Sequence, residues 1–162
     1  MKTANATNLK FYTPESYQPQ MSVAYLMLRN KSIYQRVGDV KLAELGVTAA
    51  HMSVMVIISH AEFSTISSVS QALGVDPAAT VRVVQKLVSM KLIRKEQSKK
   101  DGRVIGLSLT ADGIKITKLI APVWCDLLNQ SLSGFTKKEF EQLKDFLFRI
   151  EKNNLLQLGD AL

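Results

Sequence analysis

The chain has 162 residues, 46% of them hydrophobic, so we expect a single domain, residues 1–162, with a core of its own. Its 21 Lys and Arg residues against 14 Asp and Glu residues give a net charge of +7, which favours polyanionic partners. A lone Cys125 excludes an internal disulfide, and the sequence has neither a secretory signal nor an apolar run of about 18 residues. We therefore expect a cytoplasmic protein without a membrane partner.

The first part of the chain is expected to form an arm and two helices. Residues 1–20 mix Asn, Thr, Pro and aromatic residues without periodicity, which is typical of an extended arm. Apolar residues then recur at helical spacing over residues 21–45, with Gly38 as a candidate break. Gly46 can end that helix, and Thr48 is a suitable N-cap for a second helix running to about residue 60. This second helix is apolar on nearly every side, which predicts a central position.

Two further helices, over residues 66–73 and 77–90, are predicted to meet at a tight corner. Gly74 follows the last apolar residue of the first, Asp76 is a suitable N-cap, and Pro77 suits the first helical position of the second. The second of these helices turns one apolar face inward. Its opposite face carries polar and basic residues and no acid: Arg82, Gln85, Lys86 and Ser89.

Two short strands and two long helices complete the expected elements. Residues 92–96 and 103–109 predict a β-hairpin, with Asp101-Gly102 as a favoured turn between them. Thr110 caps a helix reaching about residue 130, in which Pro122 is a candidate kink. A capping box at Thr136 opens the last helix. The predicted fold class is mainly α with a small β-hairpin wing.

The positive charge is concentrated in residues 77–103. Eight basic residues stand there against two acids, a local charge of +6, so the rest of the chain carries only +1. A basic helix face suits the major groove of B-DNA, and a narrow cationic hairpin suits the adjacent minor groove or the backbone. Arg103 is the natural cation of the hairpin tip, and Asp101 can hold its guanidinium through an ion pair. For any single lysine, a solvated surface charge remains the alternative.

The order of these elements and three motifs resemble the MarR family of dimeric winged helix-turn-helix transcription factors. The wing is similar to the family's Asp-x-Arg, alternating apolar residues and Leu-Thr-x-x-Gly pattern, and a second match lies at Leu45-Gly46-Val47-Thr48. The third match runs from residue 72 to residue 93. The wing motif consists here of Asp101, Arg103, Leu107, Leu109, Thr110 and Gly113.

The resemblance implies a winged helix-turn-helix lobe over residues 46–110 between two dimerisation regions, residues 1–45 and 111–162. The apolar stripe of the last helix, which includes Leu143 and Leu147, independently calls for a partner surface. We therefore expect a homodimer that binds a pseudo-palindromic operator in double-stranded DNA. The predicted DNA-binding residues are Thr80, Arg82, Gln85, Lys86, Ser89, Arg94, Lys99, Lys100, Asp101 and Arg103.

Some positions depart from the family pattern. Ala78, Ala79 and Val81 stand where relatives often have Ser or Thr, which removes hydroxyl groups that bond phosphates or base edges. Gly102 stands where relatives often have a second Arg. Direct base reading therefore rests on few side chains.

The resemblance also implies a repressor that a small, often phenolic, anion releases from DNA. Such ligands enter a crevice between the dimer helices and the DNA-binding lobe of the family. The candidate effector-binding residues in this chain are Tyr25, Arg29, His51, Met55 and Trp124, and core packing is the alternative for each of them except Arg29, for which it is a solvated charge.

Other functions have less support in the sequence. Two His and one Cys are too few for a metal site, so we expect neither a metal nor a cofactor. No nucleophile, base and orienting group can be placed together, so we do not expect an enzyme. We interpret Cys125 as a packed, unreactive thiol beside Trp124 and Leu127, and a redox sensor is the alternative. The alternative function is a winged-helix dimer acting as a ligand-binding or protein-interaction module with little direct reading of DNA sequence.

Overall fold

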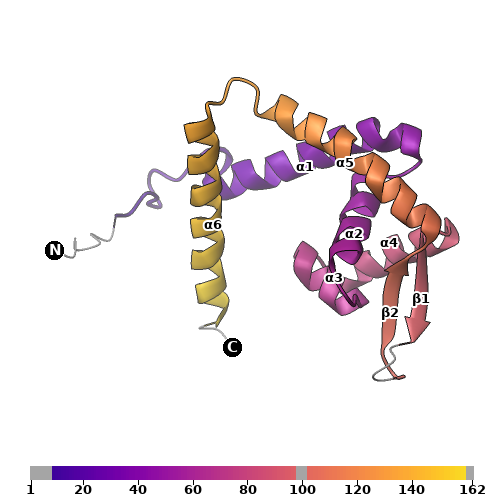
Figure 1. Cartoon of the computed structure of the whole chain (residues 1–162). Coiled ribbons are helices and arrows are strands. Elements are labelled where there is room, and N and C mark those ends of the chain that lie inside the picture. The colour runs from indigo at the N-terminus through magenta and orange to yellow at the C-terminus, as the bar shows by residue number, and fades with distance from the viewer. Residues whose placement is uncertain (1–8, 98–101, 160–162) are drawn as a thin grey trace, which may run out of the picture.

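The computed structural model describes residues 9–97 and 102–159 of the chain. It is mainly helical with one antiparallel pair of strands, as the sequence predicts (Figure 1). The elements, in chain order, are η1 (Pro19–Met21), α1 (Val23–Leu42), η2 (Ala43–Leu45), α2 (Ala49–His60), α3 (Ile66–Leu73), α4 (Pro77–Ser89), β1 (Ile93–Gln97), β2 (Ile105–Leu109), α5 (Ala111–Ser131) and α6 (Lys137–Gly159).

Helix α1 is capped at its start and continuous to its end. Ser22 is the N-cap, and the hydroxyl of Tyr12 accepts a hydrogen bond of 3.0 Å from the N–H of Val23, which ties the arm to the helix. The expected break at Gly38 is wrong, because α1 runs through that residue. The glycine instead lets the ring of Trp124 approach, since a Cβ there would lie 2.7 Å from Trp124 Cζ3. Gly38 is a close-packing position between α1 and α5.

The core is built around α2, as the apolar character of that helix predicts. Val54 and Met55 of α2 are fully enclosed, and Val84 of α4, Ile93 of β1 and Ile120 of α5 pack into the same cluster. Burial of apolar side chains of this kind contributes about 1.5–3 kcal/mol each, so this cluster is the main source of stability. It fixes α4 and the strands relative to α2 and α5.

The two strands form a wing that is bonded to the rest of the lobe. Strand β1 pairs with β2 in the register Ile93 with Leu109 and Gln97 with Ile105. On its other edge β2 is held by the N–H of Leu107, which donates to the carbonyl of Ser64 at 2.8 Å. The wing is thus hydrogen-bonded on both sides of β2.

The base of the wing is joined to the start of α5. The hydroxyl of Thr110 donates to the carbonyl of Lys91 at 2.6 Å and accepts from the N–H of Gly113 at 3.0 Å. Gly113 lies so close to Leu92 that an added Cβ would overlap the Leu92 carbonyl oxygen. The glycine of the Leu-Thr-x-x-Gly motif is therefore needed for this contact.

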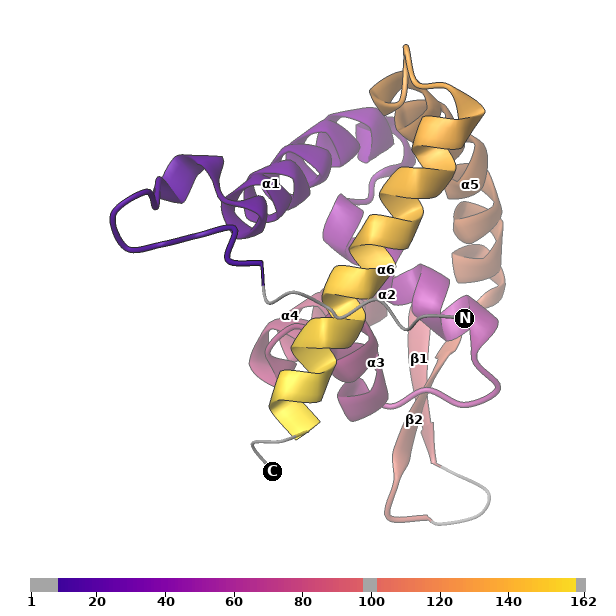
Figure 2. The ribbon, with the colours of Figure 1, turned by 90° about the vertical axis from the view of Figure 1, so that its left-hand side faces the viewer.

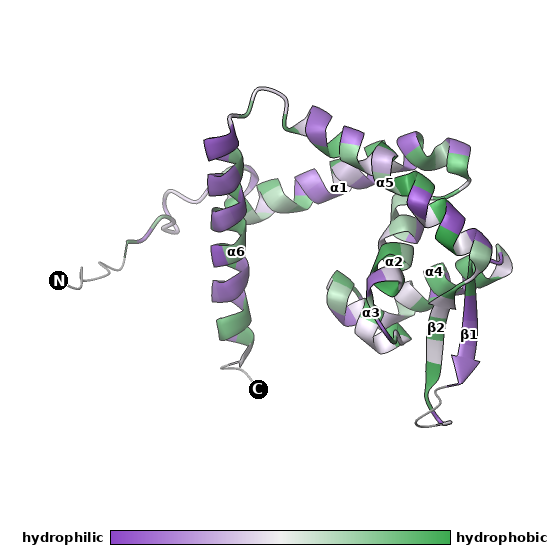
Figure 3. Cartoon of the chain, in the orientation of Figure 1, coloured by the Kyte–Doolittle hydropathy of each residue, from purple (hydrophilic) through white to green (hydrophobic). Residues whose placement is uncertain are grey.

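Helix α6 lies beside the lobe, as two perpendicular views show (Figures 1 and 2). Within Lys137–Gly159, all of which the structure describes, no residue is buried. One side of the helix is apolar and the other is hydrophilic (Figure 3). An amphipathic helix with an uncovered apolar face lacks its packing partner.

Within residues 9–97 and 102–159, no individual helix is both long enough and apolar enough to cross a bilayer. Val23–Leu45 and Ala49–His60 reach the required length and composition only when taken together, across a bend of 78°.

Candidate nucleic-acid interface

The corner between α3 and α4 sets the position of the predicted recognition helix. Gly74 ends α3 in a left-handed conformation with φ of 60°, which a side chain would strain. Two residues later, Asp76 accepts a hydrogen bond of 2.7 Å from the N–H of Ala78 and begins α4. These local signals place the start of α4, as predicted.

The outward face of α4 is polar and basic. Arg82, Gln85, Lys86 and Ser89 are all exposed, as their spacing predicts, and the hydroxyl of Ser89 donates to the Lys86 carbonyl at 2.7 Å. Two cations and a carboxamide within two turns offer fork-shaped and bidentate hydrogen bonding, which is suited to phosphate and base edges.

The assignment of Thr80 to this face is wrong. Its exposed fraction is 2%, so it cannot contact DNA from the folded lobe. Thr80, Val84 and Leu87 are spaced i, i+4 and i+7, which places all three on the core face of α4. Helical spacing therefore carried the information needed to exclude Thr80.

The wing adds further positive charge. Arg94 lies on β1 with 62% of its side chain exposed, and its Nε donates to Glu96 at 3.3 Å. Arg103 is also exposed and precedes β2 by two residues. Lys99, Lys100 and Asp101, with the expected ion pair between Asp101 and Arg103, lie outside the described residues.

The helix-turn-helix and the wing lie at the same end of the molecule. In both perpendicular views α3, α4 and the strands occupy the lower part, and the connection between α5 and α6 lies at the top (Figures 1 and 2). One end of the lobe therefore presents both elements that the sequence marks as basic.

The five candidate effector residues do not meet in one site. Met55 is fully buried in the core, whereas Tyr25 and Arg29 are exposed on α1. His51 belongs to the N-terminal cap of α2, where its Nδ1 accepts a hydrogen bond of 3.1 Å from the N–H of Thr48. Trp124 lines a surface cavity of about 350 Å³, which it shares with side chains of α1 and α2.

A crevice between α1 and the lobe involves other residues. It has a volume of about 220 Å³ and is lined by Lys31 and Gln35 of α1, Ser53 of α2 and Thr80 of α4. Lys31, Gln35 and Ser53 also line the cavity beside Trp124, so the two spaces adjoin. Lys31 and Gln35 are one helical turn apart, and that polar pair is the signal from which sequence reasoning could have found this face.

Thr80 brings an unsatisfied hydroxyl to this crevice. Its Oγ1 is buried and has no hydrogen-bond partner within the described part of the chain. A buried hydroxyl without a partner costs about 1–3 kcal/mol, so such groups are uncommon in folded proteins.

The electrostatics of His51 favour its neutral form. Burial lowers the pKa of His51, the positive charge of Lys86 lowers it further, and the negative charge of Asp39 raises it. Neutral Nδ1 is the form that can accept from Thr48, so the hydrogen bond and the pKa agree. His51 acts as the N3 residue of a capping box, a position usually held by Glu or Gln.

Cys125 is exposed in the folded chain, so the interpretation of a packed thiol is wrong. Its neighbours Trp124 and Leu127 turn toward α1 and the core, and Cys125 occupies a different face of α5. Adjacency in sequence does not place residues on the same face of a helix.

Comparisons with known proteins agree with this geometry. The family model of the transcriptional regulator SarA/Rot matches residues 36–120, more than half of the chain. The HTH-type transcriptional repressor MdtR of Bacillus subtilis is 28% identical over 121 residues, covering 72% of this chain and 77% of MdtR.

Similar solved structures include DNA complexes. MepR of S. aureus in complex with DNA has a TM-score of 0.73 at 18% identity and covers 84% of this chain and 99% of MepR. A mutant of MarR from E. coli complexed with operator DNA has a TM-score of 0.71 at 25% identity, covering 78% of this chain and 91% of MarR. BpsR of Bordetella bronchiseptica, whose DNA binding is regulated by 6-hydroxynicotinic acid, has a TM-score of 0.75 at 19% identity and covers 83% of this chain and 96% of BpsR.

The fold is that of the MarR class of winged helix-turn-helix proteins, and the family match covers the helix-turn-helix and the wing. Members of this class regulate transcription by binding DNA and are not enzymes. The chain belongs to the SarA/Rot family of DNA-binding transcriptional regulators.

Proposed function

We propose that the protein is a dimeric, sequence-specific repressor that a small ligand releases from its operator. The observation that carries this proposal is the exposed, acid-free face of α4 at the same end of the lobe as a basic wing. In this arrangement α4 enters the major groove, and the wing contacts the adjacent minor groove or the backbone. The similarity to MdtR, a transcriptional repressor, and to MepR and MarR in their complexes with DNA supports the same role.

The proposed DNA contacts are of two kinds: contacts to base edges, which select the sequence, and contacts to the backbone, which position the protein. Arg82 and Gln85 reach base edges, whereas Lys86 and Ser89 bind the backbone beside them. The wing residues Arg94, Lys99, Lys100 and Arg103 neutralise phosphates or enter the minor groove, and Asp101 orients Arg103.

A second copy of the chain covers the exposed apolar surfaces. Leu143, Phe146 and Leu147 of α6 and Leu26 of α1 are 36–51% exposed in the single chain. Residues 1–45 and 111–162 provide the dimer contact in this proposal. A two-fold dimer presents its two α4 helices to half-sites about 34 Å apart, which matches a pseudo-palindromic operator.

The ligand binds in the crevice between α1 and the lobe. Lys31 supplies a positive charge and Gln35 supplies a carboxamide, and Thr80, whose buried hydroxyl has no partner among the described residues, forms part of the wall. These groups suit a small aromatic or phenolic anion, and BpsR is regulated by a molecule of that kind. Because Thr80 belongs to the inner face of α4 and forms part of the crevice wall, a ligand in the crevice acts directly on the recognition helix.

A binding experiment with variants tests the DNA-binding part. Arg82→Ala and Gln85→Ala should change which sequences are selected from random DNA, and each should cost about 1–3 kcal/mol on the preferred site. Arg103→Ala should weaken binding to all sequences about equally. The control is Arg149→Ala, whose side chain pairs with Asp145 on α6 and should leave affinity unchanged.

The salt dependence gives a second readout. The logarithm of the affinity should fall with the logarithm of the salt concentration, with a slope of about 0.9 per phosphate neutralised. A flat salt response, or Arg82→Ala and Arg103→Ala variants that bind like the parent, would contradict the proposal. Ligand binding that persists without any DNA binding would instead support a ligand-binding or protein-interaction module.

A further inference from the structure

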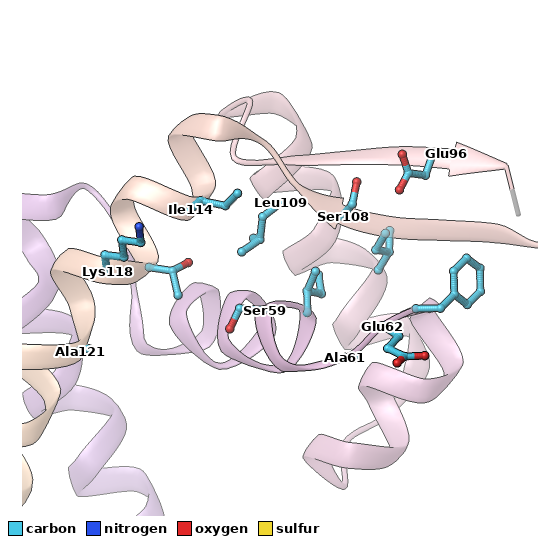
Figure 4. A pocket seen from close by; sticks show the side chains of 13 residues that line it. Ser59, Ala61, Glu62, Glu96, Ser108, Leu109, Ile114, Lys118 and Ala121 are labelled. Carbon is cyan, nitrogen blue, oxygen red and sulfur yellow. The ribbon is translucent and has the colours of Figure 1, made fainter.

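A further cavity, of about 580 Å³, shares no lining residue with the crevice beside α1 or with the cavity beside Trp124. It lies between the C-terminal end of α2, the loop that follows, the wing and the first half of α5 (Figure 4). Its volume is within the range of about 300–1,000 Å³ that small-molecule sites occupy in proteins. The cavity therefore has room for a drug-sized molecule.

The charges of this cavity are separated. Glu62, from the loop after α2, and Glu96, from β1, lie at one end, and Lys118 of α5 lies at the other (Figure 4). Apolar side chains, among them Leu109 and Ile114, lie between the two ends. A ligand in this space meets an acidic end and an apolar middle.

Phe63 adds an aromatic ring to the acidic end. In the antiparallel register Glu96 is paired with Gly106, so both project from the same face of the wing. Phe63 packs on that face, since a Cβ on Gly106 would lie 2.5 Å from Cε2 of the Phe63 ring. A carboxylate beside an aromatic ring is a combination that attracts organic cations, particularly quaternary ammonium groups.

The end of α2 strengthens the negative potential. Ile58, Ser59 and Ala61 at the C-terminus of α2 line the cavity, and the last carbonyl groups of a helix carry the negative end of its dipole. Arg94 competes for Glu96, but both members of that ion pair are about half exposed or more, and such pairs contribute little.

We propose that this cavity binds a small amphipathic organic cation, with its charged head between Glu62 and Glu96 beside Phe63 and its apolar body on Leu109 and Ile114. The site differs in place and in the sign of its ligand from the anion crevice beside α1. A bound cation contacts the wing and α2 on one side and α5 on the other, so it couples the DNA-binding lobe to a helix of the proposed dimer region. Binding itself requires neither DNA nor the proposed repressor function.

Isothermal titration of the full chain without DNA tests the proposal. The probe is tetraphenylphosphonium, an aromatic cation, and the uncharged control is triphenylphosphine oxide, which has three of the four phenyl groups. We expect saturable binding of one tetraphenylphosphonium per chain, and binding of the oxide weaker by about tenfold or more because it lacks the charge. Since the net charge of +7 opposes cation adsorption, such binding would identify an acidic site.

Three variants locate the binding. Glu62→Gln combined with Glu96→Gln should weaken tetraphenylphosphonium binding by about tenfold while preserving shape. Ala121→Phe should block the cavity from α5, and the matched control Glu44→Gln, an exposed acid outside the cavity, should bind as the parent does.

The proposal is overturned if tetraphenylphosphonium does not bind saturably, if the oxide binds equally well, or if the double Gln variant binds like the parent. Circular dichroism checks that Ala121→Phe folds. If a folded Ala121→Phe variant keeps full binding, the cation lies elsewhere and the proposal also fails. DNA binding measured separately tests the repressor function, so the two failures are distinguishable.

Discussion

The absence of a side chain at Gly113 allows the start of α5 to pack closely against the base of the wing. Its backbone lies against the carbonyl of Leu92, the residue that leads into β1, and a Cβ would overlap that oxygen. The obstacle is backbone rather than a flexible side chain, so neither group can move cheaply.

We therefore expect Gly113→Ala to lower the free energy of unfolding by roughly 1–3 kcal/mol despite the higher helix propensity of alanine. Urea denaturation followed by circular dichroism measures the change. Gly159→Ala, also helical but with open space around it, is the control and should cause no loss. Equal stability of the two variants would show that the contact is not close.

His51 makes the stability of the lobe depend on pH. Its pKa in the folded protein is lowered from the ordinary value of 6.5, mainly by burial, so the unfolded chain binds the proton more tightly. The stabilising contribution is thus complete above pH 6.5 and is lost as the pH falls from there through the folded-state pKa.

Replacing His51 by Gln should remove this loss, because Gln can fill the same capping position without titrating. The urea concentration at half-unfolding, measured from about pH 5 to about pH 8, gives this pH dependence on both sides of the ordinary histidine pKa of about 6.5. The parent chain, measured over the same pH range, is the control. A slope that survives in His51→Gln would assign the effect to another group.

At the scale of elements, local chemistry explains why most boundaries were predictable. The hydroxyls of Thr48, Thr110 and Thr136 and the carboxylate of Asp76 each accept from the backbone N–H expected of an N-cap. These bonds span two or three residues, so they can be found in the sequence. The capping box at Thr65 follows the same rule, with Ser68 as its N3 residue.

The cap of α4 gives an element-scale prediction. Asp76→Ala should cost about 1 kcal/mol, because the N–H of Ala78 loses its acceptor. Hydrogen exchange at the first turn of α4 should accelerate, and operator affinity should fall because Arg82 is less firmly held. Asp76→Ser is the control, since serine caps helices about as well. Unchanged exchange in Asp76→Ala would show that the carboxylate is not acting as a cap.

At the scale of the whole molecule, α6 indicates that the single chain is incomplete. Leu143 and Leu147 lie on its apolar side, and the Asp145–Arg149 ion pair lies on the other. The sequence predicted this apolar stripe. It could not show that the stripe would remain unburied in the single chain. Helical periodicity identifies a face to be buried without identifying the surface that buries it.

Leu143→Glu combined with Leu147→Glu should separate the proposed dimer. Each carboxylate would be buried without a partner, at a cost of about 2–5 kcal/mol, so we expect a dissociation constant raised about 100-fold or more. Sedimentation equilibrium measures it. Arg149→Glu, on the opposite side of α6, is the control and should dimerise normally. A double variant with the parent's mass in solution would place the contact elsewhere.

The proposed effector site was the least predictable part, because it depends on tertiary contacts. The five candidates were chosen by residue type, and the fold disperses them between the core, a helix cap and the surface. The crevice is instead formed where Lys31 and Gln35 of α1 face Thr80 of α4. Residues 45 or more positions apart meet only after packing, and no local pattern records that meeting.

The bond between Leu107 and Ser64 constrains how the proposed repressor could change shape. Because β2 is bonded both to β1 and to the loop before α3, the wing cannot swing alone. Any rotation of the lobe about α1 and α5 displaces α4 and the wing together as one rigid body. Contacts in both grooves are then lost in a single step, so release from an operator should be all-or-none at each half-site rather than gradual.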